Sequence, residues 1–414
     1  MNFKILKIAF SNIVKQKRRT FFNVVTFAAN AVAIISLIGM LNGMYNQAFE
    51  RTIELDTGHF KIYNAGFIKE KTKLPIELNI DNPYGVIEDL RGISHFVSAA
   101  PRITRYITIS DFKKKTSVMA IGIDMQAELK TMKIFDRITE EYYLPEDGGK
   151  ILLGRKLGSL MGVEQGASML VYGQTQYKAN NLSDVEVQGL YVSGFEKMEK
   201  SVAYVPLKFF QIFLDMHEKA TEIVIRIKDR KYVKEVKGEI ENVLKEKYPG
   251  LEVRDWTQEA AALIAGAQMD YVSYSILFAI LLFLAIFIIM NTLTITVFER
   301  TAEIGTLRAI GMEKTQIGWM FMWEGLMLSF GGAVIGGIAA LPIAWYMNTY
   351  GIPMPADFAE MMPFPIESMT SKNVSFDWVL TAVICVVTGV IGAILPSVRA
   401  ADTDIVNALK KGVR

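Results

Sequence analysis

Four long apolar stretches dominate the pattern of hydrophobic and polar positions along the chain. Residues 21–49, 271–298 and 378–398 contain no charged side chain, and residues 315–356 contain a single one, Glu324. A helix needs about 20 apolar residues to cross the hydrocarbon core of a bilayer, so each stretch is long enough. The pattern therefore predicts four transmembrane helices, at residues 21–45, 271–298, 317–346 and 378–398.

The first apolar stretch could instead be a secretory signal peptide, because six basic residues precede it. Ala29, Asn30 and Ala31 even resemble a cleavage site. These residues lie inside the apolar run, however, whereas cleavage sites follow it. A retained membrane anchor is therefore the better interpretation.

The distribution of Lys and Arg predicts how the chain is oriented. Six basic residues lie in residues 1–20, three in the 299–316 link and four in the 399–414 tail, whereas the 347–377 loop has one. Short segments rich in Lys and Arg stay in the cytoplasm. We therefore expect both termini and the 299–316 link to be cytoplasmic. The 347–377 loop and the long 46–270 segment are then expected on the outer side.

The 46–270 segment has the pattern of a folded α+β domain. Runs rich in β-branched and aromatic residues alternate with turn residues, which is typical of strands. Residues 231–247 place Val233, Val236, Ile240 and Leu244 on one face, as in an amphipathic helix. The expected strands are residues 59–63, 103–110, 117–123, 168–172, 185–192, 202–205 and 221–227. The predicted fold class is an α+β membrane protein, with four transmembrane helices and a large extracytoplasmic α+β domain between helices 1 and 2.

Composition excludes several classes of function. The chain has 45 basic and 43 acidic residues, a balance that disfavours nucleic acid as a partner. Cys385 is the single cysteine, and the three histidines (His59, His95 and His217) show no metal-ligand spacing. The sequence also contains no phosphate-binding loop or dinucleotide fingerprint. We therefore expect no catalytic residue, no metal site and no bound cofactor, and we expect that the chain is not an enzyme.

The 299–316 link carries the most informative motif, ERTAEIGTLRAIGM at residues 299–312. Ile304, Leu307 and Ile310 recur every three residues, with charged residues around them. A short helix that is apolar on one side is suited to a groove on another protein. A solvated turn between two helices is the alternative, and the residues alone do not choose between them. The candidate coupling residues are Glu299, Arg300, Glu303, Ile304, Gly305, Leu307, Arg308, Ile310 and Gly311.

The same motif, followed by Gln316–Ile317 and by Glu324–Gly325, resembles the signature of FtsX-like permeases, which are ABC-transporter subunits. Residues 150–157 and 162–166 resemble the external-domain motif of the MacB and LolC/LolE proteins, as do residues 187–194 and 202–207. The tail at residues 396–401 resembles the terminal motif of the family. Ile405 departs from it, because relatives usually have Pro there.

The resemblance implies a multi-pass protein of the bacterial inner membrane whose 299–316 link couples to a separate cytoplasmic ATPase dimer. ATP and Mg²⁺ would bind to that ATPase, and a second permease copy or paralogue would complete the assembly. Glu324, the only acid inside a span, is either functional or reaches the inner membrane surface. Two pairs of small residues would let helices approach closely, within this chain or between chains. These residues are Gly331, Gly332, Gly336 and Gly337.

Three functions fit this family. A LolC/LolE-like subunit would release lipoproteins from the membrane, with a periplasmic chaperone as a further partner. A MacB-like permease would act in efflux with a periplasmic adaptor, and an FtsX-like regulator would control cell-wall hydrolases. The 225-residue external segment disfavours the third function, and a chain of this length without a fused ATPase favours the first.

The orientation can be tested by cysteine labelling in spheroplasts, after Cys385 is replaced by Ser. A cysteine at Ser183 should react with a membrane-impermeant thiol reagent, because the basic residues predict that this segment is outside. A cysteine at Thr306 should not react until the membrane is permeabilised. Labelling of Thr306→Cys in intact spheroplasts would mean that the orientation is inverted.

Overall fold

The computed structural model describes residues 2–134, 143–355 and 368–403. The chain divides into two compact units, which we call the helical unit and the α+β unit. The helical unit comprises Met1–Asn46, Gly266–Met354 and Ser368–Arg414. The α+β unit comprises Gln47–Ala265 and Pro355–Glu367.

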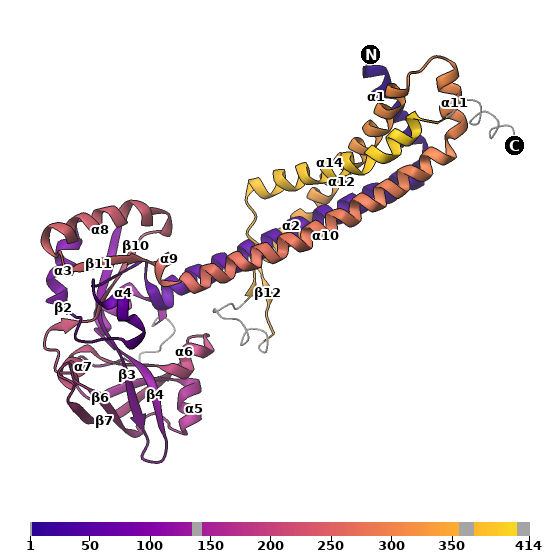
Figure 1. The fold of residues 1–414 in the computed structure, drawn as a ribbon. Helices are drawn as coiled ribbons and strands as arrows, with labels where there is room; N and C mark the ends of the chain where they lie inside the picture. The colour runs from indigo at the N-terminus through magenta and orange to yellow at the C-terminus, as the bar shows by residue number, and fades with distance from the viewer. Residues whose placement is uncertain (1, 135–142, 356–367, 404–414) are drawn as a thin grey trace. The chain divides into compact units, whose positions relative to one another are not determined.

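Among the described residues, six helices build or enter the helical unit, and four of them are long and apolar enough to cross a membrane (Figure 1). The four are longer than the predicted transmembrane spans, because each continues into polar residues at one or both ends. Within these helices, the limits of the membrane-spanning parts stay a prediction. The helices are α1 (Asn2–Lys15), α2 (Lys17–Thr52), α10 (Ala261–Glu299), α11 (Thr301–Ala309), α12 (Lys314–Thr349) and α14 (Ser375–Ala401).

Small residues let α12 and α14 pack closely. A Cβ atom added to Gly389 would lie 2.3 Å from the Cβ atom of Ser329, and one added to Gly325 would lie 2.7 Å from that of Ala393. Contacts this short exist only because one partner has no side chain. The helical unit is therefore held by close helix packing through small residues, as in other membrane bundles.

The α+β unit is built on a nine-stranded sheet, in the order β11-β1-β10-β3-β4-β8-β5-β7-β6. β6 also pairs with β3, so the six strands β3, β4, β8, β5, β7 and β6 close into a barrel. Two short strands, β2 (Ile80–Asp81) and β9 (Lys219–Ala220), form a separate pair. The nine strands of the sheet are β1 (Phe60–Asn64), β3 (Phe96–Ser110), β4 (Lys115–Ile123), β5 (Lys150–Gly154), β6 (Ser168–Gln174), β7 (Asn180–Tyr191), β8 (Val202–Pro206), β10 (Glu222–Ile227) and β11 (Leu251–Asp255).

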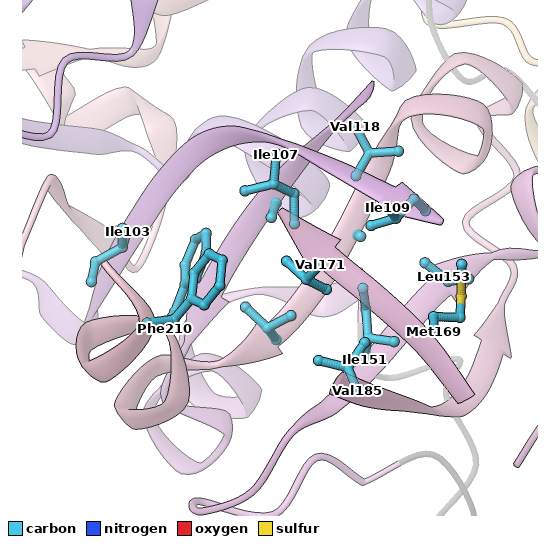
Figure 2. Packing of buried hydrophobic residues seen from close by; sticks show 14 of the residues in the cluster. Ile103, Ile107, Ile109, Val118, Ile151, Leu153, Met169, Val171, Val185 and Phe210 are labelled. Atoms are coloured by element: carbon cyan, nitrogen blue, oxygen red, sulfur yellow. The ribbon is translucent and has the colours of Figure 1, made fainter. Parts of the chain in front are cut away.

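The 15-residue strand β3 belongs to both halves of the sheet. Its first part pairs with β10, and its last three residues, Thr108–Ser110, pair with β6. Ile103, Ile107 and Ile109 alternate along β3 and fill the barrel interior, as Figure 2 shows. This alternation fixes the register, because a shift by one residue would turn all three outward.

A second core lies between the other end of the sheet and two helices, α3 (Pro83–Leu90) and α8 (Val233–Lys247). The four apolar residues that predicted α8 are all buried in this cluster. The α+β unit therefore has two lobes, each with its own hydrophobic core. The remaining helices of the unit are α4 (Met125–Thr131), α5 (Arg155–Met161), α6 (Glu196–Ser201), α7 (Leu207–Phe213) and α9 (Trp256–Glu259).

The predicted fold class is confirmed, since four membrane helices accompany a large α+β domain placed between the first and the second. Each of the seven expected strands coincides with a strand of the structure. Two strands of the sheet were not anticipated, β5 in its interior and β11 at its edge. The apolar part of β5 is only Ile151–Leu153, and β11 has just two apolar residues, Leu251 and Val253, so neither run gives enough periodicity to detect.

Candidate coupling site

The predicted coupling segment forms α11, which joins α10 to α12 (Figure 1). The helix ends because Gly311 adopts a φ of 103°, a conformation that glycine tolerates best. The backbone N–H of Met312 then donates to the carbonyl of Leu307, which closes the last turn. α12 begins at a capping box between Glu313 and Gln316. The C-terminal end of α11 and the start of α12 are thus specified locally, and the segment is a helix rather than a solvated turn.

A buried ion pair fixes the start of α11. The Arg300 guanidinium lies 3.1 Å from the Glu324 carboxylate of α12, and the two side chains are only 8% and 5% exposed. Asn12 of α1 donates a 2.8 Å hydrogen bond to the same carboxylate. Arg300 Nε also lies 2.8 Å from a carboxylate oxygen of Glu303. The pair therefore connects α11 to α1 and α12 at one point.

Apolar contacts fasten the middle of α11. Ile304 is buried in a cluster with residues from four other helices, and Gly305 beside it is also buried. The cluster lies on the same side of α11 as Arg300, since residues four apart share a face. Its other members are Ile5, Ala9, Val297, Ile317, Met320, Phe321 and Ala400.

Polar contacts connect α11 and its neighbours to the ends of α14 and α2. Arg308 donates hydrogen bonds to the carbonyls of Ala401, at 3.4 Å, and Thr403, at 2.9 Å. On the other side, Arg19 lies 2.8 Å from the Glu299 carboxylate at the end of α10. The segment is therefore tied to every membrane helix of the unit.

Comparisons with known proteins agree with this arrangement. The family model "FtsX-like permease C-terminal" matches residues 275–405, which include α11, α12 and α14. A lipoprotein-releasing system transmembrane protein, LolC of Xylella fastidiosa strain Temecula1, is 21% identical over 349 residues, 81% of this chain and 80% of that protein. The macrolide export ATP-binding/permease protein MacB of Nitrobacter winogradskyi is 22% identical and covers 98% of this chain and 60% of its own length. Residues 275–405 are therefore an FtsX-like permease domain, and the chain is similar to LolC and MacB over most of its length.

This FtsX-like permease is thus an ABC-transporter permease of the group that contains MacB and LolC, and it is a multi-pass inner-membrane protein. Family members work with a cytoplasmic ABC ATPase. Among solved structures, the periplasmic region of MacB from Actinobacillus actinomycetemcomitans is similar at a TM-score of 0.37 and 13% identity, over 52% of this chain and 97% of that one.

The structure corrects the predicted apolar stripe of this FtsX-like permease. Ile304 faces the helical unit, Leu307 is half-buried and Ile310 is 79% exposed, so the three residues do not form one docking face. Each residue advances about 100° around a helix, so a spacing of three turns the side chain by about 60° each time. The exposed face of the segment instead carries Glu303, Thr306 and Ile310.

Two contributors were missing from the predicted site, Asn12 and Arg19. A sequence signal existed for Asn12, because Ile5, Ala9 and Asn12 lie at i, i+4 and i+7 on one face of α1. Arg19 gave no such signal, since it was one of six basic residues ahead of the first span.

The described residues contain no group of three His, Cys, Asp or Glu side chains that could hold a metal ion.

The four candidate packing glycines divide into two pairs. A Cβ atom on Gly332 would lie 2.2 Å from the Cβ atom of Phe27, and one on Gly336 would lie 2.5 Å from the carbonyl oxygen of Ala28. These two glycines therefore pack within the chain, against α2. Gly331 and Gly337 have no atom within 4 Å of an added Cβ.

The glycine pairs can be separated by alanine substitution. Gly332→Ala or Gly336→Ala should destabilise the protein by about 1–3 kcal/mol, because the methyl group overpacks the contact with α2. Gly331→Ala and Gly337→Ala are the matched controls and should not destabilise the protein, because the added methyl group meets no neighbour and alanine favours a helix by about 1 kcal/mol over glycine. Thermal melting of the purified chain in detergent measures the difference. Equal loss of stability in both pairs would refute the assignment.

The ion pair can be tested by exchange of its charges. Glu324→Arg or Arg300→Glu alone should cost about 3–5 kcal/mol, because each leaves like charges buried together. The double variant Arg300→Glu with Glu324→Arg should recover a large part of that loss, as read from the melting temperature. Additive losses in the double variant would show that the two side chains do not act as a pair.

Proposed function

We propose that this chain is the permease subunit of an ABC transporter that releases lipoproteins from the inner membrane, in the manner of LolC and LolE. It receives the ATP-driven motion of a separate ATPase through α11 and passes that motion to the α+β unit. ATP and Mg²⁺ bind to the ATPase, and this chain itself is not catalytic. A second copy or a paralogue of the permease completes the membrane part.

The observation that carries this proposal is the two-sided character of α11. One side is fixed to the other helices by Arg300, Ile304 and Arg308. The other side leaves Ile310 exposed beside Thr306 and the Glu303 carboxylate. A large apolar side chain on a short, firmly held helix is suited to a groove of a partner protein. Such a helix moves its neighbours when the partner moves it.

The far ends of α2 and α10 have a matching set of attachments inside the α+β unit. A π-helical turn, Ile53–Thr57, follows α2, and the Arg102 guanidinium donates to the carbonyl of Asp56 in it at 3.2 Å. Arg102 itself is buried in an ion pair with Glu128. The first contact ties the turn after α2 to strand β3, the strand that the two lobes share, and the second fixes the Arg102 side chain to α4.

The start of α10 is attached in a similar way. Glu259 lies at the end of α9, directly before α10, and its carboxylate is almost fully buried. It accepts a 2.9 Å hydrogen bond from the Tyr63 hydroxyl and forms ion pairs with Lys71 and Arg254. Movement of either helix is therefore expected to act on the sheet itself, because buried charged contacts resist separation.

Lipoprotein release is favoured over efflux by the extent of the matches. LolC of Xylella fastidiosa, LolC of Neisseria meningitidis and LolE of Haemophilus influenzae each align over 80% or more of this chain. A MacB-like efflux permease acting with a periplasmic adaptor is the second candidate, since the MacB alignment covers 98% of this chain. An FtsX-like regulator of cell-wall hydrolases is the third candidate, and the size of the α+β unit disfavours it.

The docking role of α11 predicts the effect of one substitution. Ile310→Asp should reduce co-purification of the ATPase by about tenfold or more, because an unpaired carboxylate would be buried in an apolar contact. The melting temperature should not change, since the side chain is exposed in the isolated chain. Stoichiometry of the ATPase in affinity-purified membranes is the measurement.

Ile212→Asp provides the matched control, because Ile212 is 69% exposed in the α+β unit and receives the same change. This variant should retain the ATPase at the wild-type ratio. If Ile310→Asp also retains it at that ratio, α11 is not the docking element and the proposed route of coupling is wrong.

A further inference from the structure

A polar cavity in the α+β unit has no role in the proposed function. It has a volume of about 230 Å³ and lies where three segments meet. The first segment is the end of α2 with the turn that follows it, from Glu50 to His59. The second is the end of β10 with residues 226–230, and the third is the end of α4 at Thr131 with Lys133 just after it. A water molecule occupies about 30 Å³, so the cavity has room for a small oxyanion.

The acidic side chains that line this cavity are already compensated. Glu50 lies 3.2 Å from Arg230, and Glu54 forms an ion pair with Lys133. Asp229 accepts a 2.9 Å hydrogen bond from the backbone N–H of Lys231 and lies 3.9 Å from its ammonium. None of these carboxylates is therefore left to neutralise the other basic residues of the lining.

Two basic side chains of the lining remain uncompensated. Neither the Arg226 guanidinium nor the Lys228 ammonium has an ion pair or a hydrogen bond to any residue that the structure describes. Lys228 is exposed and well solvated, but Arg226 is half-buried. A half-buried charge without a partner is costly and calls for a ligand or a solvent network.

His59 adds an uncharged donor to the same lining. It is only 8% exposed, and its Nδ1 accepts a 3.4 Å hydrogen bond from the backbone N–H of Ile227. Burial, together with the nearby Arg226 charge, lowers the pKa of His59 to about 4. The ring is therefore neutral at pH 7 and carries its proton on Nε2. No residue in the described part of the chain accepts that proton.

We infer that this cavity binds a phosphate group through Arg226 and Lys228, with His59 as a third donor. A guanidinium matches the oxygen geometry of phosphate and can bind two oxygens at once, while an ammonium adds a compact charge. Free phosphate and a phospholipid headgroup share this chemistry. The position of the lining along the chain favours a phospholipid headgroup, since only residues 46–49 separate Glu50 from the predicted end of the first span.

The full-length chain offers a direct readout, because it contains three histidines. We would label histidine with ¹³C, purify the chain in detergent, and titrate it with inorganic phosphate against sodium chloride of equal ionic strength. The NMR signal of His59 should shift in a saturable way with phosphate alone. His217 is the internal reference, because its side chain is 73% exposed and pairs with Asp215 outside the cavity.

Substitution identifies the residues that bind. Arg226→Gln should weaken the phosphate response of His59 by about tenfold or more without changing the melting temperature. Lys234→Gln removes an exposed charge from α8, outside the cavity, and should leave the response unchanged. The inference fails if the His59 signal does not respond to phosphate, or if Arg226→Gln responds as the wild type does.

A lipid arm then distinguishes the two sources. In phosphatidylglycerol nanodiscs without free phosphate, a headgroup ligand would already place the His59 signal at its phosphate-bound position. If the signal moves there only when inorganic phosphate is added, the ligand is free phosphate. Both results support a phosphate site, and neither depends on whether the protein transports lipoproteins.

Discussion

The contact between Arg300 and Glu324 is the interaction on which the helical unit most depends. Both charges are removed from water, and their desolvation is offset only because Asn12 and Glu303 supply further polar contacts. The pair joins the start of α11 to α12 and, through Asn12, to α1. A displacement of α11 that kept this contact would have to carry both helices with it.

The same principle recurs in the α+β unit, where buried charges hold the segments next to α2 and α10. Arg102 reaches the turn after α2, and Glu259 is enclosed before α10 begins. These hydrogen bonds are directional, whereas apolar packing is not, because a hydrogen bond weakens steeply when its geometry is disturbed. The two helices that are covalently continuous with the domain are therefore also the ones with rigid polar attachments to its sheet.

Periodicity predicted α8 and seven of the nine strands of the main sheet, because burial of one face imposes a period that is visible in the residues themselves. Val233, Val236, Ile240 and Leu244 show this for α8. The orientation of α11 could not be obtained in the same way. Which of Ile304 and Ile310 is buried depends on four other helices, and no local pattern contains that information.

The two pairs of glycines could not be told apart for a similar reason. Gly331 and Gly332 are neighbours of the same type, and only the position of α2 makes one of them necessary. The partner of Glu324 was within reach of sequence reasoning. Glu324 lies near the cytoplasmic start of the third predicted span, and Arg300 follows the cytoplasmic end of the second, so the two are expected at similar depth. Opposite charges in a medium of low dielectric constant attract strongly.

The central claim is that a separate ATPase drives this permease, and affinity purification of the wild-type chain from native membranes in mild detergent tests it most directly. The preparation should contain a second polypeptide that binds and hydrolyses ATP, and a lipid-anchored protein should accompany the complex. Removal of the second polypeptide should abolish hydrolysis. ATP hydrolysis by this chain alone would contradict the account.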